Sequence, residues 1–220
     1  MILCILAFTV VQSVDDIVAK AVDARGGMKH IKAINTQRLT GRISFTGGGG
    51  PLEVEMKRPG MMREMVTIGD KSQIRTTNGE VGWAAGTLRQ VPTPQPLDAQ
   101  ELHNLASSAD FEGPLVDYKE KGNRIELAGK EKVGKRMAYK LVITMKNGEN
   151  RIDFIDCKSH LEVKWRGLVS GNMFESLFLD YRRIKGIMYA FEIDSGNQKI
   201  VLDKVEVNPP LDDSRFGKPE

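Results

Sequence analysis

The chain has 220 residues, of which 40% are hydrophobic and 28% are charged, and its formal net charge at pH 7 is +3. This length and composition are typical of a single globular domain with one hydrophobic core. Positive and negative charges are mixed along the whole sequence, without a dense block of lysine and arginine, so we do not expect nucleic-acid binding.

The first 13 residues, 1–13, carry no charge and are mostly apolar. They are too short to span a bilayer, and they match the apolar core of a secretory signal peptide. We therefore expect a signal peptide that is cleaved after Ser13 and directs residues 14–220 to the periplasm as a single domain. The basic segment that normally precedes such a core is missing, which suggests a start further upstream. The alternative is a buried N-terminal strand. Cleavage leaves Cys157 without a partner cysteine, so no intramolecular disulfide is expected.

A helix is predicted directly after this segment. Asp15 and Asp16 follow the capping residue Ser13, apolar residues recur at helical spacing, and the glycines 26–27 end the helix. Residues 28–34 are expected to add a helical turn. From residue 36 the apolar residues alternate with a period of two, which predicts strands at 51–58, 61–68, 71–77 and 80–85 after a first strand. The glycines 47–50 predict a loose hairpin loop, and Asn78 with Gly79 predicts a tight hairpin.

Residues 86–117 interrupt this series of strands. The proline-rich part, 91–96, predicts an extended surface loop, and residues 98–109 predict a second amphipathic helix whose capping box is formed by Asp98 and Glu101. Strands are then predicted at 123–132, 136–145, 149–156, 161–167, 172–183, 187–194 and 198–207. We therefore expect a mainly β (α+β) protein with about 11–12 antiparallel strands and two or more helices. Because so long a sheet should curl, the helices are expected to cover its concave side.

The strand at 51–58 places an arginine in phase with apolar residues. One face of this strand carries Leu52, Val54 and Met56. The other face carries Glu53, Glu55 and Lys57. If the alternation continues, Arg58 points to the apolar side, where a guanidinium needs polar partners. This pattern indicates a functional arginine. The alternative is that the strand ends before Pro59 and leaves Arg58 in solvent.

Three segments resemble a known family in the order in which that family has them. Residues 54–63, Val-Glu-Met-Lys-Arg-Pro-Gly-Met-Met-Arg, resemble the Lys-Arg-Pro strand-turn of the LolA-like family, the periplasmic carriers that sort lipoproteins to the outer membrane. Residues 78–83, Asn-Gly-Glu-Val-Gly-Trp, resemble the hairpin that follows in that family. Residues 207–213, Val-Asn-Pro-Pro-Leu-Asp-Asp, resemble its terminal Pro-Pro and acidic segment.

The resemblance implies an unclosed β-barrel with a helical lid and an apolar cavity for lipoprotein acyl chains. In that family the arginine of the Lys-Arg-Pro motif lies inside the barrel and donates hydrogen bonds to backbone groups of the lid, which holds the ligand-free form closed. The matching residue here is Arg58. The residues expected to line the cavity are Val54, Met56, Met61, Met65, Trp83, Leu102 and Leu105. The alternative is that these residues fill an ordinary core. The methionines after the motif replace aromatic residues that are frequent in the family, so the resemblance does not define the ligand.

The sequence offers little for catalysis. His30, His103 and His160 are far apart and lack metal-ligand spacing, and Cys157 follows an aspartate, which disfavours a reactive thiol. We therefore expect no enzyme, metal or cofactor. The predicted function is a monomeric periplasmic carrier whose partners are lipoprotein acyl chains or similar lipids, together with donor and acceptor proteins at the membranes. The alternative is a lipid or lipoprotein sensor or scaffold that signals to a partner protein. A lipid or ester hydrolase is disfavoured, because no catalytic group of residues can be assembled.

Overall fold

The computed structural model describes residues 12–88, 90–169 and 171–220, which form three α-helices and one large antiparallel sheet. Helices α1 (Val14–Arg25) and α2 (Gly27–Lys32) follow each other directly, and α3 (Ala99–Ser108) lies between the two series of strands. The α1 cap is the one predicted, because the Ser13 side chain accepts a hydrogen bond from the Asp16 amide (3.1 Å). The α3 cap is also the one predicted, because the Asp98 carboxylate accepts a hydrogen bond from the Glu101 amide (2.7 Å).

Most of the predicted signal peptide, residues 1–11, lies outside the described residues. The two residues that follow make specific contacts: the Ser13 side chain caps α1, and the Gln12 side chain accepts a hydrogen bond from the Tyr139 hydroxyl (2.5 Å). Cleavage after Ser13 would remove both contacts, so the predicted boundary falls within a structured helix cap and stays a prediction.

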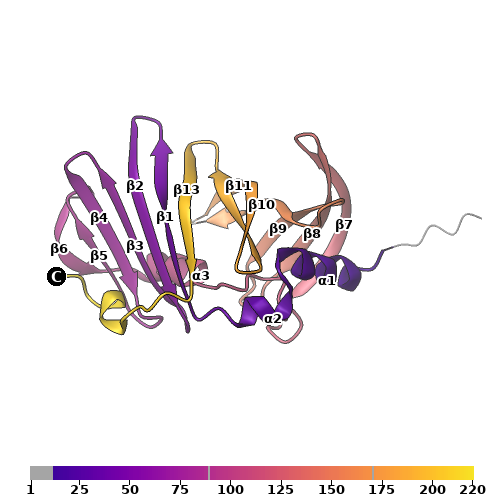
Figure 1. Cartoon of the computed structure of the whole chain (residues 1–220), viewed down its shortest axis with the longest axis horizontal. Helices are drawn as coiled ribbons and strands as arrows, with labels where there is room; N and C mark the ends of the chain where they lie inside the picture. The colour runs from indigo at the N-terminus through magenta and orange to yellow at the C-terminus, as the bar shows by residue number, and fades with distance from the viewer. Residues whose placement is uncertain (1–11, 89, 170) are drawn as a thin grey trace, which may run out of the picture.

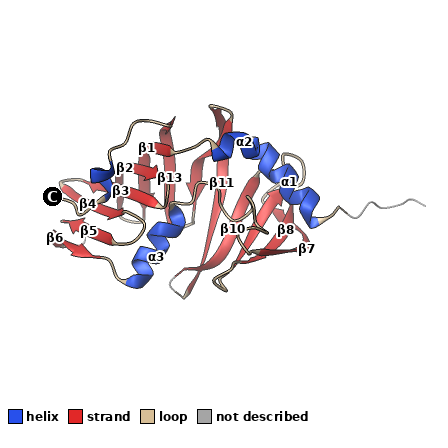
Figure 2. Ribbon diagram, turned by 90° about the horizontal axis from the view of Figure 1, so that it is seen from below, coloured by secondary structure: helices blue, strands red, loops and turns tan. Residues whose placement is uncertain are grey.

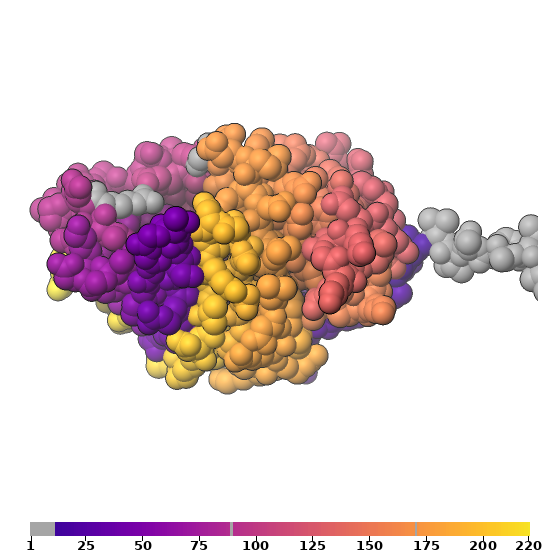
Figure 3. Space-filling model, turned by 90° about the horizontal axis from the view of Figure 1, so that it is seen from above, coloured from indigo at the N-terminus to yellow at the C-terminus, as the bar shows by residue number. Residues whose placement is uncertain are grey.

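Within the described residues the sheet has thirteen strands, where about 11–12 were predicted. They are β1 (Thr36–Phe45), β2 (Gly48–Lys57), β3 (Met61–Ile68), β4 (Lys71–Thr77), β5 (Gly82–Gly86), β6 (Val91–Pro96), β7 (Arg124–Val133), β8 (Arg136–Thr144), β9 (Asn150–Asp156), β10 (Glu162–Val169), β11 (Asn172–Ile184), β12 (Ile187–Asp194) and β13 (Gln198–Val207). The spatial order runs from β6 to β1, crosses to β13, and continues down to β7. The two ends of the sheet, β6 and β7, are unpaired with each other, so the barrel is unclosed. Figure 1 shows the curled sheet, and Figure 3 shows the two series of strands meeting where indigo β1 adjoins yellow β13.

The proline-rich segment predicted to be a loop forms the edge strand β6. Its prolines occupy alternate positions, 92, 94 and 96. The amide of Leu97 donates to the Gly82 carbonyl (2.9 Å), so the backbone nitrogen of the preceding Pro96 points away from β5, towards the open edge. An edge strand tolerates prolines there, because those positions need no amide donor.

Two predicted turns also differ from the structure. Residues 48–50 belong to β2, and only residues 46–47 form the turn. A Cβ atom at Gly50 would lie 1.8 Å from the Thr67 carbonyl oxygen, so only a glycine allows β2 and β3 to approach this closely. The predicted tight hairpin at Asn78 and Gly79 is a four-residue loop, residues 78–81, because the Asn78 side chain accepts hydrogen bonds from the amides of Glu80 and Val81 (3.0 Å each).

The two faces of the sheet are covered by different parts of the chain. The inner face, defined here as the face of Leu52, Val54 and Met56, packs against the helices in one hydrophobic cluster. Helix α1 contacts β7 and β12, α2 contacts β12, and α3 contacts β3 and β4 (Figure 2). On the outer face, the C-terminal 3₁₀ helix η1 (Asp213–Phe216) contacts β3 and β4 and buries Phe216 completely.

Candidate functional site

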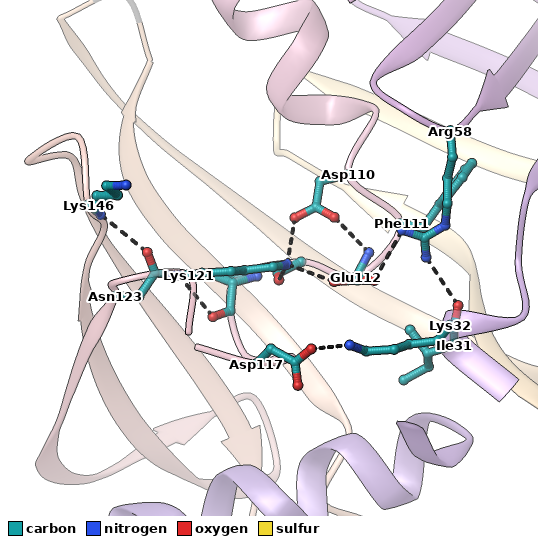
Figure 4. Close-up of polar contacts among 12 residues, drawn as sticks. Ile31, Lys32, Arg58, Asp110, Phe111, Glu112, Asp117, Lys121, Asn123 and Lys146 are labelled. Atoms are coloured by element: carbon teal, nitrogen blue, oxygen red, sulfur yellow. Dashed lines mark hydrogen bonds and ion pairs between the residues drawn. The ribbon is translucent and has the colours of Figure 1, made fainter. Parts of the chain in front are cut away.

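Arg58 follows the last residue of β2, and its side chain reaches the end of helix α2. Its Nε donates to the Ile34 carbonyl (2.6 Å), and one Nη donates to the Ile31 carbonyl (3.3 Å), as Figure 4 shows for Ile31. Carbonyls at a helix C-terminus lack intrahelical donors and carry partial negative charge, so a guanidinium is well placed to satisfy them. Both acceptor residues belong to the core cluster, which places the Arg58 side chain on the inner side of the sheet.

The same guanidinium also contacts the segment that follows α3. Its other Nη donates to the Glu112 carboxylate (3.0 Å), and its central carbon lies 5.2 Å from the centre of the Phe111 ring. The Glu112 side chain is only 13% exposed, whereas that of Arg58 is 31% exposed. One arginine therefore joins the end of β2 to the end of α2 and to the segment after α3.

Glu112 has a second cationic partner in Lys121. The Lys121 ammonium lies 3.2 Å from the other Glu112 carboxylate oxygen and 3.2 Å from the Asp110 carboxylate, and it donates to the Gly113 carbonyl (2.9 Å). We call Arg58, Phe111, Glu112 and Lys121 the Arg58 cluster (Figure 4). Phe111, Glu112 and Lys121 cannot be identified from the sequence, because no local pattern indicates that residues 111–121 pack beside the end of β2.

The seven residues predicted to line a cavity are divided between the two faces of the sheet. Four of them lie at the inner face: Val54, Met56, Leu102 and Leu105. Val54, Met56 and Leu105 are buried in the core cluster. The Leu102 side chain points at β5, since it lies 3.0 Å from the position of a Cβ atom built on Gly82.

The other three predicted residues, Met61, Met65 and Trp83, lie on the outer face. Met61 pairs with Lys57 and Met65 pairs with Glu53, both on the charged side of β2. The Trp83 ring lies 5.1 Å from the Lys218 ammonium of the C-terminal segment. The sequence shows these residues as apolar, but only the pairing register decides which face they occupy. Met62, paired with Met56, is the methionine of this strand that faces inward.

The inner face packs against the helices, and Val54, Met56 and Leu105 are buried there. Two hollows lie elsewhere on the described part of the molecule. One, of about 300 Å³, lies between α1 and residues 115–120, and the other, of about 560 Å³, lies beside residues 209–212. Neither is lined by Val54, Met56, Leu102 or Leu105. A ligand that reaches the buried Val54, Met56 and Leu105 would have to displace the helices.

A buried group of charges lies further along the inner face. Arg151 donates to Asp153 (2.6 Å) and to Glu162 (2.9 Å), and Asp153 is paired with the core residue Leu141. Burial raises the pKa of Asp153, and burial together with the nearby Asp153 charge raises the pKa of Glu162 to about 8. The second carboxylate oxygen of Asp153 is buried without a hydrogen-bond partner among the described residues. The sequence places Arg151 and Asp153 on one face by alternation, but it does not show that Glu162 lies beside them.

Within residues 12–88, 90–169 and 171–220, no group of three or more histidine, cysteine, aspartate or glutamate side chains is arranged to hold a metal ion. None of the helices in these ranges combines the length and the apolar character that crossing a bilayer requires.

Comparisons with known proteins give matches in structure only. No family model and no curated protein matches the sequence. A DUF1329 family protein from Desulfovibrio piger has a TM-score of 0.57 and 12% identity over 91% of this chain and 95% of its own. A putative outer membrane lipoprotein-sorting protein domain from Vibrio parahaemolyticus has a TM-score of 0.56 and 10% identity over 92% and 95% of the two chains. A LolA superfamily protein from Nitrosomonas europaea has a TM-score of 0.54 and 14% identity over 91% and 96%. At these identities the likeness concerns the fold, and this chain has the LolA-like fold.

Proposed function

We propose that the protein is a periplasmic carrier that binds the acyl chains of lipoproteins, or a similar long-chain apolar ligand, and delivers them towards the outer membrane. One observation carries this proposal. The arginine of the Lys-Arg-Pro turn holds the end of α2 and the segment after α3 over an apolar inner face, in a LolA-like fold. The proposed binding surface includes Val54, Met56, Leu102 and Leu105.

Transfer of an acyl chain requires a protein surface that replaces much of the lipid environment. Each methylene group moved out of a membrane costs about 0.8 kcal/mol, so a long chain costs on the order of 10 kcal/mol. The apolar inner face can offset this cost once the helices move aside. A carrier that offset all of it could not release its ligand.

The Arg58 contacts favour a closed, ligand-free state that competes with ligand binding. They stabilise the closed, ligand-free arrangement, and ligand entry has to break them. Closing the helices again restores the contacts and favours release. Arg58 would therefore act as a latch, and the proposed function needs no chemical turnover.

A loading and transfer assay tests the proposal. The protein is purified from the periplasm, its bound lipids are identified by mass spectrometry, and transfer of a labelled lipoprotein to acceptor membranes is measured. The wild type is expected to load and transfer. The Arg58→Leu variant is expected to load but to transfer poorly, because its closed state is no longer favoured. Arg42→Leu, which changes an exposed arginine of β1, is the matched control and should behave as the wild type.

Each outcome of this assay has a distinct meaning. Failure of the wild type to bind any lipid or lipoprotein would contradict the proposed function. Efficient transfer by Arg58→Leu would contradict the latch. Stable lipid binding by the wild type without transfer would favour the alternative of a sensor or scaffold, and cleaved lipid would indicate an enzyme.

A further inference from the structure

The inner face is covered by two helical regions that are far apart in the chain. Helices α1 and α2 lie on the β7 and β12 side, whereas α3 lies on β3 and β4 (Figure 2). Strands β1 to β6 separate the two regions in the sequence. Chain connectivity therefore does not require the two regions to move together.

Arg25, the last residue of α1, makes a direct connection between them. Its two Nη groups donate to the backbone carbonyls of Phe111 and Glu112, just after α3. The end of α1 is itself held in place, because a Cβ atom at Gly26 would lie 2.6 Å from the Gly186 carbonyl oxygen, at the β11–β12 turn. Arg25 thus fixes the backbone of residues 111–112 to the joint between α1 and α2.

Glu112 completes a closed circuit of polar contacts. Its backbone accepts from Arg25, and its carboxylate accepts from Arg58. Arg58 in turn donates to the carbonyl of Ile31, in α2, and to that of Ile34, just after it. Moving one helical region alone would break part of this circuit and leave partly buried polar groups without partners. A polar group that loses its partner while it stays buried raises the free energy of the protein. The cost is much smaller when all the groups become exposed to water together.

We propose that Arg25 and Glu112 couple α1 and α2 to the segment after α3, so that the helices over both parts of the inner face open as one unit. Arg25 and Glu112 are positioning residues in this scheme. The scheme rests on the proposed function for what the opening admits, but the coupling is a property of the ligand-free protein. It can therefore be tested without any lipid.

Hydrogen–deuterium exchange of the ligand-free protein provides the test. Removal of one set of these hydrogen bonds should raise the opening equilibrium roughly 5- to 10-fold. Arg58→Leu is therefore expected to raise exchange in α1–α2 and in α3 by the same factor. In the double variant Arg25→Gln with Arg58→Leu, exchange in α1–α2 and exchange in α3 should rise by different factors, because the connection through Arg25 is lost. Glu112→Ala combined with Arg25→Gln removes both connections at residue 112, so exchange in the two regions should again rise by different factors.

Lys20→Gln, which changes an exposed residue of α1, is the control for a general effect on that helix, and thermal unfolding verifies that every variant is folded. The inference is overturned if Arg58→Leu changes exchange in only one helical region or in neither. It is also overturned if, in the double variant Arg25→Gln with Arg58→Leu, exchange in the two helical regions still rises by the same factor. Absence of lipid transfer in the loading and transfer assay would contradict the proposed function, but it would not affect the conclusion drawn from the exchange experiment.

Discussion

Two charged residues at and just beyond the end of β2, Glu55 and Arg58, are held by the structure in opposite ways. On the outer face, Glu55 is completely buried and accepts hydrogen bonds from Arg38 (2.8 Å) and Arg215 (2.7 Å). At the inner side, Arg58 remains 31% exposed and contacts backbone carbonyls and one carboxylate. The partner Arg215 belongs to the C-terminal segment, which is anchored by the buried Phe216. The partners of Arg58 belong to helices that rest on an apolar surface.

This difference fits the proposed roles, in which the contact of Glu55 is permanent and the contacts of Arg58 are reversible. Burial alone would raise the pKa of Glu55, but the hydrogen bonds from Arg215 and Arg38 outweigh it and lower the pKa. Loss of these partners would leave a carboxylate inside the protein without water. Arg58 already has access to water, so its separation from its partners costs far less. The outer contact is suited to holding the C-terminal segment, and the inner contact is suited to opening.

The largest expected effect comes from breaking the outer contact. Glu55→Ala should lower the free energy of unfolding by about 3–5 kcal/mol, because it removes two charge-assisted hydrogen bonds, from Arg38 and from Arg215, at a completely buried position. Urea unfolding measures the change. Glu80→Ala, in the exposed loop after β4, is the control. A loss of less than about 1 kcal/mol would show that the buried contact is dispensable.

A smaller, pH-dependent effect is expected at Glu162. Its pKa is raised to about 8 from its ordinary value of 4.5, so between these pH values the folded state holds a proton that the unfolded state releases. Its contribution to stability is fully present below pH 4.5 and is lost as the pH rises towards 8. Glu162→Gln cannot ionise, so we expect it to be more stable than the wild type at pH 8, on the order of 2 kcal/mol, with the advantage shrinking towards pH 5.

Thermal unfolding from pH 5 to pH 9 measures this effect. Glu126→Gln, at an exposed position of β7, is the control and should show no such trend. An advantage of Glu162→Gln that is the same at every pH would rule out a protonated Glu162 in the folded protein.

The smallest expected effect on stability is that of Arg58→Leu. Arg58 is partly exposed, and Lys121 still neutralises Glu112 when Arg58 is removed. We expect a loss of about 1 kcal/mol or less in urea unfolding. A loss as large as that of Glu55→Ala would show that Arg58 is a structural residue like Glu55, and it would weaken the latch proposal.

Much of the local structure could be predicted from the sequence. The caps at Ser13 and Asp98 gave the starts of α1 and α3 correctly, and the alternation of β2 placed Arg58 on the side of Val54 and Met56. The resemblance to the LolA-like family indicated the fold. The edge strand β6 was missed, since three prolines suggest a loop unless the chain is known to lie at the edge of a sheet.

The amino-acid sequence by itself determined the helices, most of the strands and the two faces of each strand, because these depend on residues that are neighbours in the chain. The tertiary structure decided which strands pair and in which register, and with it the position of every side chain relative to the other strands. It therefore decided that Met61, Met65 and Trp83 face outward, that Glu162 lies beside Arg151, and that Glu112 meets both Arg25 and Arg58. Register and long-range packing follow from the free energy of the whole assembled sheet, and no short segment contains that information.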